Sequence, residues 1–342
     1  MIITIIGSSP GESAILMFSD GAIITIDCCK RKNKNFMVEY FNDQGLDFAK
    51  VSHNVITHFH NDHVAGMDEL INACPNSKVV LPDLWRSIEF KHFAARLTPD
   101  VSTGPGTVIT EVLKVFDILE KARHRVDYGA ELTCLYPAPH IASATGERLT
   151  VVSPTNFRKT NFLASLAQAL GKSDADLRRF GVEDQNDASM SFLIQDGGSL
   201  YFLGGDLQNI HPHCDIDQIH TSHATAGQNY GLVKIPHHGS STSFSALLRA
   251  KVKNNETKVV ITPYPQGHKR LPSKETATYL NGVLECYVLE GEIMGLARSD
   301  RTIASLNIVP VREYRPGVAE YCDGSITLQR CVTLEKYLSA HL

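Results

Sequence analysis

Residues 55–70 read VITHFHNDHVAGMDEL, and they place three histidines and an aspartate within six consecutive positions. Side chains two residues apart on an extended segment point to the same side, so His58 and His60 can hold one metal ion together. The turn that follows brings Asp62 and His63 round toward a second position nearby. We predict that this stretch supplies the first half of a metal site and that it decides the fold around it.

The chemistry of these side chains favours a site with two metal ions. Imidazole nitrogen suits zinc, iron or manganese, and a carboxylate adds a harder oxygen ligand. A single structural zinc ion would be closed by four ligands at this place or by cysteines, and no cysteine is adjacent. A surface role, with Asp62 capping a following helix, would not explain so many ligand-type residues so close together.

The stretch lies where a predicted strand, residues 53–60, runs into a predicted helix, residues 63–74, whose apolar residues recur at helical spacing. Short β-branched runs separated by turn signals predict further strands at 1–7, 12–18 and 22–28. The turn after a strand of an α/β sheet is a common place for a functional site. The local pattern therefore predicts both the class of fold and the place of the site.

The rest of the chain continues the alternation of strands and helices. Later strands are predicted at 77–82, 148–154, 230–236, 258–264, 285–291 and 301–310, and helices at 108–124, 161–180, 244–252 and 273–283. We interpret residues 84–185 as an elaboration within one domain. Strands in both halves with helices between them predict an α/β protein with a two-sheet core and helices outside.

Two later strands end in further ligand-type residues. The clearest hairpin, residues 189–206, has two apolar runs around the turn sequence DGG, and its second strand ends on Asp206 after two glycines. The strand in VKIPHHG ends on His237 and His238. Since the loops of a parallel sheet gather at one edge, we expect these residues to complete the site begun by His58.

Composition excludes several classes of function. The chain has 342 residues, 43% of them hydrophobic, with a net charge of −4, which gives no general attraction for nucleic acid or an acidic membrane surface. No apolar run reaches the ~18 residues that span a bilayer, and no signal peptide is visible. The eight cysteines form no C-x-x-C pair, which is typical of reduced thiols. We therefore predict a cytoplasmic protein without a membrane partner.

Three motifs resemble one known family. THFHNDH matches the H-x-H-x-D-H signature of the metallo-β-lactamase fold, AIITIDC is similar to its second-strand segment ending in aspartate, and YFLGGD resembles the strand that ends in its bridging aspartate. GESAIL, PHHGSSTS and NDASMSFLIQDGGSLYFLGGDLQ resemble the branch typified by the DNA-uptake channel protein ComEC and by choline-phosphate esterases. The resemblance spans roughly residues 1–300. It implies an αββα four-layer sandwich with two mixed β-sheets and helices on the outer faces.

The resemblance also implies a set of ligands for two divalent metal ions, Zn²⁺ or Mn²⁺. In this set of ligands, His58 and His60 hold one ion, Asp62 and His63 hold the other, and Asp206 bridges the two ions. The last ligand is one of two adjacent histidines, with His238 preferred and His237 as the alternative. Asp27 is expected to orient ligands rather than to bind metal.

The sequence departs from the family pattern at two places. Most members have a histidine ahead of the bridging aspartate, where this chain reads QNDASMS, so Asn186, Asp187 or the more distant His140 takes its place and one of the two metal sites is expected to be weaker. The G-H-P sequence after the late strand is also changed. Its histidine is moved to His268, which lies either on the surface or in the cleft.

A hydrolytic mechanism follows from such a site. Two divalent ions can hold a hydroxide between them and polarise a phosphoryl oxygen, so we expect hydrolysis by a metal-bridging hydroxide with in-line attack on phosphorus. Asp62, His237 and His238 are the predicted catalytic residues, and whichever histidine does not bind metal would protonate the leaving oxygen.

The predicted substrate is a phosphodiester, either nucleic acid or a nucleotide-like small molecule. Two alternatives stay open: an ester, thioester or lactam hydrolase of the same fold, and a non-catalytic partner module on a retained scaffold. The hydrolase domain is predicted to span residues 1–310. Residues 311–342 are predicted to be a C-terminal extension that could contact a protein partner.

Overall fold

The structure is a computed structural model. It describes residues 1–7, 11–31, 34–97, 117, 126–129, 140–177, 185–210, 216, 229–252, 256–266, 269–280, 285–289, 292–294, 313–315, 317–322, 325–334 and 336. The predicted helix at 108–124 and the predicted strand at 301–310 lie outside these residues, apart from residue 117.

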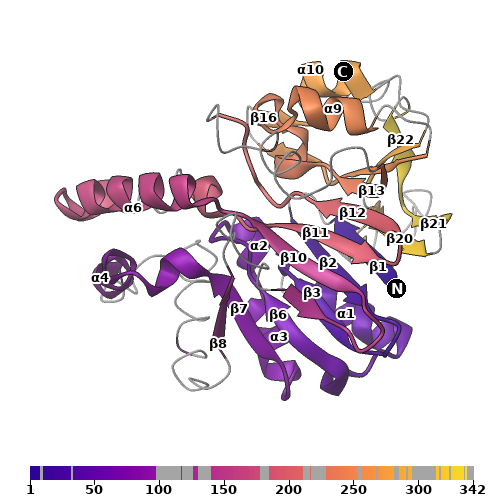
Figure 1. Ribbon diagram of the computed structural model, residues 1–342, viewed down its shortest axis with the longest axis horizontal. Helices are drawn as coiled ribbons and strands as arrows, with labels where there is room; N and C mark the ends of the chain where they lie inside the picture. Colours follow the sequence, from indigo (N-terminus) through magenta and orange to yellow (C-terminus); the bar gives the residue numbers. More distant parts are fainter. Residues whose placement is uncertain are drawn as a thin grey trace, which may run out of the picture.

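Two large mixed sheets form the core (Figure 1). The first has the order β21-β20-β1-β2-β3-β6-β7-β8, and the second has the order β22-β17-β14-β13-β12-β11-β10-β9. Strands of the first sheet are β1 (Ile2–Gly7), β2 (Glu12–Met17), β3 (Ile23–Ile26), β6 (Val51–Val55), β7 (Lys78–Pro82), β8 (Val126–Gly129), β20 (Gly317–Cys322) and β21 (Ser325–Gln329). Strands of the second sheet are β9 (His140–Ala142), β10 (Arg148–Ser153), β11 (Ser191–Asp196), β12 (Ser199–Leu203), β13 (Tyr230–Lys234), β14 (Lys258–Ile261), β17 (Cys286–Val288) and β22 (Val332–Thr333).

Each sheet combines antiparallel and parallel pairs. In the first sheet β1 and β2 are antiparallel, whereas β3, β6, β7 and β8 run parallel to one another. In the second sheet β10, β11 and β12 are antiparallel, whereas β12, β13, β14 and β17 are parallel. The carboxyl ends of the parallel strands carry the polar loops that the sequence singled out. Three further two-stranded sheets are β4 (Lys30–Arg31) with β5 (Lys34–Asn35), β15 (Tyr264–Gln266) with β16 (Lys269–Leu271), and β18 (Glu292–Met294) with β19 (Glu313–Arg315).

Helices cover the outer face of each sheet. The α-helices are α1 (Phe36–Gln44), α2 (Asn61–Val64), α3 (Met67–Ala73), α4 (Ile88–Leu97), α6 (Asn156–Leu170), α9 (Ala246–Val252) and α10 (Lys274–Leu280). The 3₁₀ helices are η1 (Phe48–Lys50), η2 (Asp83–Arg86), η4 (Gln185–Ala188), η5 (Pro236–Gly239) and η6 (Ser241–Ser243). Figure 1 shows α1 and α3 below the first sheet, α9 and α10 above the second, and α4 with α6 projecting to one side.

The hydrophobic core explains this layering. A central cluster joins the sheets face to face, with Ile5 and Ile26 from the first sheet meeting Phe192 and Leu203 from the second. Two outer clusters lie beneath the helices on either side. Because each sheet is covered on both faces, its strands are near-continuous apolar runs such as IITII. The predicted αββα sandwich with two mixed sheets and outer helices is therefore confirmed.

Some predicted boundaries were wrong. The helix expected at 63–74 is two helices, α2 and α3, because Gly66 between them has a φ of 83°, which only glycine adopts readily. The helix expected at 161–180 starts earlier, at Asn156, where the Thr155 hydroxyl accepts a bond from the N–H of Arg158 and so caps it, and it ends at Leu170.

Residues after 310 take part in both large sheets. β20 pairs with β1 along its whole length, β21 pairs with β20, and β22 pairs with β17 in the second sheet. The domain boundary at residue 310 stays a prediction. Among the helices in the described part of the chain, none is both long and apolar enough to cross a membrane.

Candidate metal centre

The HFHNDH loop follows β6 and is tied to the loop after β3. The Asp27 N–H donates to the Val55 carbonyl at 2.8 Å, and the Cys28 N–H donates to the His63 carbonyl at 2.7 Å. Asp27 itself has a φ of 57°, a conformation that aspartate tolerates better than most residues. These backbone bonds place the Asp27 carboxylate beneath the histidines.

Two glycines shape the turn that presents Asp206. A Cβ atom on Gly204 would lie 2.3 Å from Cγ of Pro236, and one on Gly205 would lie 2.4 Å from the Met190 carbonyl oxygen. Only glycine fits such close approaches. The chain can therefore turn directly after β12, and Asp206 is buried with 1% of its surface exposed.

The two adjacent histidines after β13 point in different directions. Both have positive φ values, 47° for His237 and 53° for His238. His238 Nδ1 lies 2.8 Å from the Thr262 carbonyl oxygen, and its Nε2 lies 3.1 Å from Asp62 Oδ2. His237 instead has its ring nitrogens 3.3 Å from the side-chain amides of Asn186 and Gln208.

The first pocket consists of His58, His60 and Asp206. His58 Nε2 lies 3.1 Å from His60 Nδ1 and 3.6 Å from Asp206 Oδ2. One ligand atom from each of the three residues lies within 4.8 Å of the others, which is a spacing that one metal ion can bridge.

The second pocket consists of Asp62, His63, His238 and the same Asp206. His63 Nε2 lies 3.3 Å from Asp206 Oδ1 and 3.8 Å from Asp62 Oδ2. His238 Nε2 lies 4.0 Å from Asp206 Oδ1. Asp206 thus offers one carboxylate oxygen to each pocket.

Hydrogen bonds behind the rings leave Nε2 of three histidines facing the pockets. The Nδ1 atom of His63 lies 2.7 Å from Asp27 Oδ2, and that of His238 contacts a carbonyl oxygen, so both carry the ring proton at Nδ1. Thr57 donates its hydroxyl proton to Asp27 at 2.7 Å and accepts from His58 Nδ1 at 2.9 Å. A second partner that fixes the ring nitrogen in this way is typical of metal-binding histidines.

The donor set fits divalent cations. His63 Nε2 and Asp206 Oδ1 are both buried and have no hydrogen-bond partner among the described residues, which is costly unless a cation satisfies them. Among the residues that the structure describes, four carboxylates gather here, those of Glu12, Asp27, Asp62 and Asp206, against one ammonium group, that of Lys234. A buried excess of negative charge of this kind favours binding of cations.

The two pockets differ electrostatically. Burial lowers the pKa of His58, and burial together with the neighbouring His58 lowers the pKa of His60 to about 4. Burial also opposes charge on His63, but the nearby carboxylates, led by that of Asp206, outweigh it and raise the pKa of His63 well above its usual value. The same balance raises the pKa of His238.

The six predicted ligands therefore lie together in space, and Asp27 lies behind them. Whether they hold metal, and which residues are catalytic, stays a prediction. Of the candidates for the missing family histidine, Asn186 is buried beside His237, whereas Asp187 is bonded to Arg158 at 2.7 Å. The side chain of His140 and all of His268 lie outside the described residues.

Sequence reasoning missed three polar residues that line the base of the site: Glu12, Thr57 and Lys234. A signal was present for two of them, because GESAIL and GLVKIP each place one charged residue in an otherwise apolar strand. A buried charge requires a partner, so such residues point to one another.

A family model described as anti-Pycsar protein Apyc1 matches residues 9–93, which is less than half of the chain. No curated protein matches. The narrower resemblance to ComEC-like proteins stays a prediction.

Among solved structures, the metallo-β-lactamase fold protein YhfI from Bacillus subtilis is 11% identical, with a TM-score of 0.40 over 84% of this chain and 94% of that one. The MIM-2 metallo-β-lactamase is 13% identical, with a TM-score of 0.37 over 80% of each chain. The hydrolase AbOPH of the β-lactamase superfamily is 14% identical, with a TM-score of 0.35 over 59% of this chain, which spans only 57% of that protein. Similarity at this level says nothing about substrates. The layered fold itself, with two mixed sheets and helices outside, is the one that the sequence predicts.

Proposed function

We propose that this protein is a metal-dependent hydrolase that binds two divalent cations, one in each pocket, and cleaves phosphodiester bonds in a nucleotide-like substrate. The observation that carries the proposal is the pair of buried atoms without hydrogen-bond partners, His63 Nε2 and Asp206 Oδ1, which lie 3.3 Å apart at the centre of the histidine cluster. The two atoms face each other without forming a hydrogen bond, as two ligands of one cation would.

Bound divalent cations lower the pKa of water and polarise a phosphoryl oxygen. The residues of the chain would position the reactants. Asp206 links the pockets through its two carboxylate oxygens, and Asp62 Oδ2 lies between His63 and His238. We assign His237 to the protonation of the leaving oxygen, because its ring lies outside both pockets between the amides of Asn186 and Gln208.

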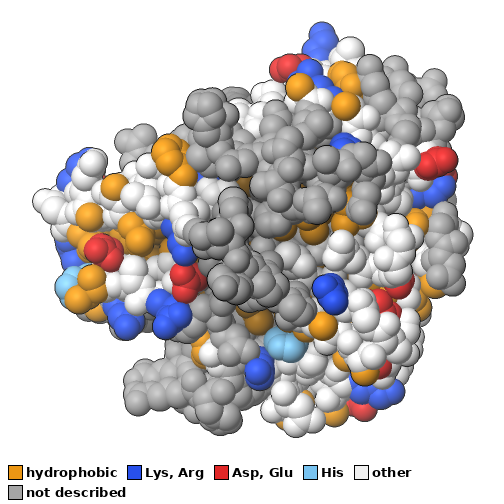
Figure 2. Space-filling model, viewed as in Figure 1, with side chains coloured by type: hydrophobic (Ala, Val, Ile, Leu, Met, Phe, Trp, Pro, Cys, Tyr) orange, Lys and Arg blue, Asp and Glu red, His pale blue; other side chains and the backbone are white. Residues whose placement is uncertain are grey.

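We favour a compact nucleotide over a long nucleic acid strand, because a net charge of −4 gives no general attraction for a phosphate backbone. On the face drawn in Figure 2, basic side chains over α4 and α6 are mixed with acidic and hydrophobic ones, and the described residues of that face form no continuous basic surface. A long strand needs such a surface to track its phosphates. The partial match to the Apyc1 model is compatible with a nucleotide substrate and does not select one.

Elemental mass spectrometry of the purified protein tests the proposal, together with assays of bis-p-nitrophenyl phosphate, p-nitrophenyl acetate and a chromogenic lactam with added Mn²⁺ or Zn²⁺. Asp206→Ala is the test variant, and Asp43→Ala, on an exposed turn of α1, is its matched control. We expect about two metal ions per chain and diesterase activity that only Asp206→Ala abolishes. Turnover of the ester or lactam alone would favour the alternative hydrolases, and a wild-type protein without bound metal would overturn the proposal.

A further inference from the structure

The candidate metal centre is assembled across the two sheets. The histidines of the HFHNDH loop follow β6 of the first sheet, whereas Asp206 and His238 follow β12 and β13 of the second. The distances between the ligands of each pocket therefore depend on the relative position of the two sheets. A metal ion would tolerate only small changes in these distances. Something at the base of the site must hold that position.

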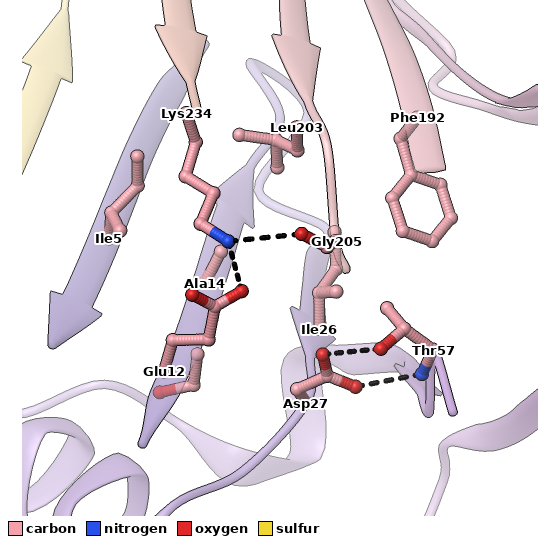
Figure 3. A pocket seen from close by; sticks show the side chains of 11 residues that line it. Ile5, Glu12, Ala14, Ile26, Asp27, Thr57, Phe192, Leu203, Gly205 and Lys234 are labelled. Carbon is pink, nitrogen blue, oxygen red and sulfur yellow. Dashed lines mark hydrogen bonds and ion pairs between the residues drawn. The ribbon is translucent and has the colours of Figure 1, made fainter. Parts of the chain in front are cut away.

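A buried ion pair joins the sheets at this point. Glu12 at the start of β2 and Lys234 at the end of β13 point toward each other between the sheets (Figure 3). Their exposed fractions are only 5% and 4%. The pair lines a small cavity of about 30 Å³ that also reaches Asp27 and Thr57.

Both partners also contact the segments that carry the ligands of the second sheet. Lys234 Nζ donates to the Gly205 carbonyl oxygen at 3.3 Å, and Gly205 directly precedes Asp206. The Thr262 hydroxyl donates to Glu12 Oε2, and the Thr262 carbonyl oxygen contacts His238 Nδ1. Glu12 Oε2 itself lies 3.5 Å from His238 Nδ1.

We place Glu12 behind the rings and not among the metal ligands, because of the side of the rings that it faces. Its carboxylate groups with His63, Asp206 and His238 within 4.8 Å, but it faces the Nδ1 side of both histidines, at 3.9 Å and 3.5 Å. Their Nε2 atoms face the opposite way, toward Asp206 and Asp62. Lys234 moreover occupies one oxygen of the Glu12 carboxylate.

Stability alone is a weak reason for such a pair. Desolvation of two charges can exceed their mutual attraction, and apolar replacements of buried ion pairs are often neutral or stabilising. The contacts of the pair with Gly205 and Thr262 give it a more specific consequence.

We propose that Glu12 and Lys234 are positioning residues, which hold the Gly205–Asp206 turn and the His238 ring in register with the HFHNDH loop and so set the metal affinity of the second pocket. The inference rests on the proposed function in requiring that the pockets bind metal. It adds that the ion pair affects the metal affinity by positioning the ligands and not through its charges.

The double variant Glu12→Gln/Lys234→Met separates geometry from charge. It removes one negative and one positive group, so the net charge of the site is unchanged, while the bond from Lys234 to Gly205 and the ion pair between the sheets are lost. The matched control is Lys258→Met/Glu285→Gln, which removes an ion pair at the opposite end of β14. Chelator competition measures the two metal affinities, and ¹¹³Cd resonances report each pocket separately.

We expect the double variant to bind the second-pocket ion about 10- to 100-fold more weakly than wild type, as is usual when an outer hydrogen-bond partner is lost. Its ¹¹³Cd signal for that pocket should shift, whereas the control should match wild type in both respects. Wild-type affinity and spectrum in the double variant would overturn the inference, even if the melting temperature falls.

A milder variant keeps the test decisive if the double variant does not fold. Thr262→Val keeps volume and both charges. It removes the hydroxyl bond to Glu12 and the longer hydroxyl contact, at 3.4 Å, with His238 Nδ1, while the backbone carbonyl to His238 remains. We expect about a fivefold loss of affinity, the value of one hydrogen bond, and no loss would overturn the inference. The wild-type protein is titrated in parallel. If it binds no metal, the proposed function fails, and this outcome is distinct from a failure of the present inference.

Discussion

The two pockets share Asp206 but differ in how the chain supports their other ligands. In the second pocket, His63 and His238 are each held from behind by an oxygen, one from the Asp27 carboxylate and one from the Thr262 carbonyl. In the first pocket, His58 is held through the hydroxyl of Thr57, and His60 is partly exposed at the start of α2. Both rings of the second pocket thus have a direct oxygen partner at Nδ1.

Charge follows the same division. Carboxylates raise the pKa values of His63 and His238, whereas burial lowers those of His58 and His60. A cation entering the second pocket would therefore meet more negative charge and displace protons, whereas one entering the first pocket would meet neutral rings with less attraction. Because each pocket has two histidines, we expect the support behind the rings and the charge around them to make the second pocket the stronger metal site.

The largest effect is expected from Asp206→Ala, because Asp206 is the one residue that both pockets share. We expect both ions to be lost and turnover of a phosphodiester to fall at least about a thousandfold, since metal stabilisation contributes several kcal/mol to the transition state. Metal content by elemental mass spectrometry and steady-state rates measure this. A variant that keeps one full equivalent of metal would break the comparison, because Asp206 would then serve a single pocket.

The next effect concerns Asp27, which holds His63. Asp27→Asn suits the positive φ of this residue, but it places an amide N–H₂ or a neutral oxygen against His63 Nδ1. The ring proton then moves toward Nε2, where it blocks the cation, and we expect the affinity of the second pocket to fall about 10- to 100-fold.

Chelator competition with Zn²⁺ measures the effect of Asp27→Asn on each pocket. Asp43→Asn, on an exposed turn of α1, is the control and should leave both affinities within about twofold, as for a change outside the site. Equal losses in both pockets for Asp27→Asn would mean that Asp27 supports them alike through Thr57.

Acidity should separate the pockets further. Because the pKa values of His63 and His238 are raised, their protons stabilise the metal-free protein below the usual histidine pKa of ~6.5, and this contribution is lost as pH rises through the raised values. Metal affinity of the second pocket should accordingly rise by about tenfold per pH unit for each displaced proton. The first pocket should change little, since the pKa of His60 is lowered to about 4.

Calorimetric titration in two buffers of different ionisation enthalpy counts the displaced protons. His60→Ala restricts the measurement to the second pocket, and the slope of its affinity against pH between about pH 6 and 8 should remain that of wild type. If metal affinity rose more steeply with pH in the first pocket than in the second, the electrostatic difference between the pockets would be the reverse of the one described.

The smallest effect is expected from Thr57→Val, which removes the hydroxyl between Asp27 and His58 without changing the volume. The first pocket should weaken about fivefold, the value of one hydrogen bond of ~1 kcal/mol. Thr150→Val on β10 is the matched control and should change neither pocket. A loss larger than that for Asp27→Asn would show that the first pocket is the better supported one.

Much of the fold followed from local pattern. The DGG turn fixes β11 and β12 in the register Asp196 to Ser199, and β-branched runs gave β1, β2 and β3 to within a residue or two. Gly66 shows the limit, because a helix pattern of apolar residues runs across it while the backbone requires a positive φ there. Helix α1, which begins after the capping residue Asn35, was not predicted.

The sequence predicted those residues of the site that stand out as ligand-type side chains in short motifs. His58 to His63, Asp206 and His238 stand at strand ends, where chemistry is expected. The sequence could not distinguish His237 from His238, whereas in the structure the ring of His238 contacts Asp62 and the ring of His237 contacts the amides of Asn186 and Gln208. Glu12 and Lys234 lie 222 residues apart, so no local pattern could join them.

The pairing of β20 with β1 has a consequence for the synthesis of the protein. One side of β1 pairs with β2 at once, but its other side stays open until residues 317–322 leave the ribosome, from Ile2 opposite Cys322 to Gly7 opposite Gly317. An exposed strand of isoleucines is a template for aggregation. A nascent chain stalled or truncated near residue 310 would carry that open edge, and its survival in the cell would depend on chaperones that shield it.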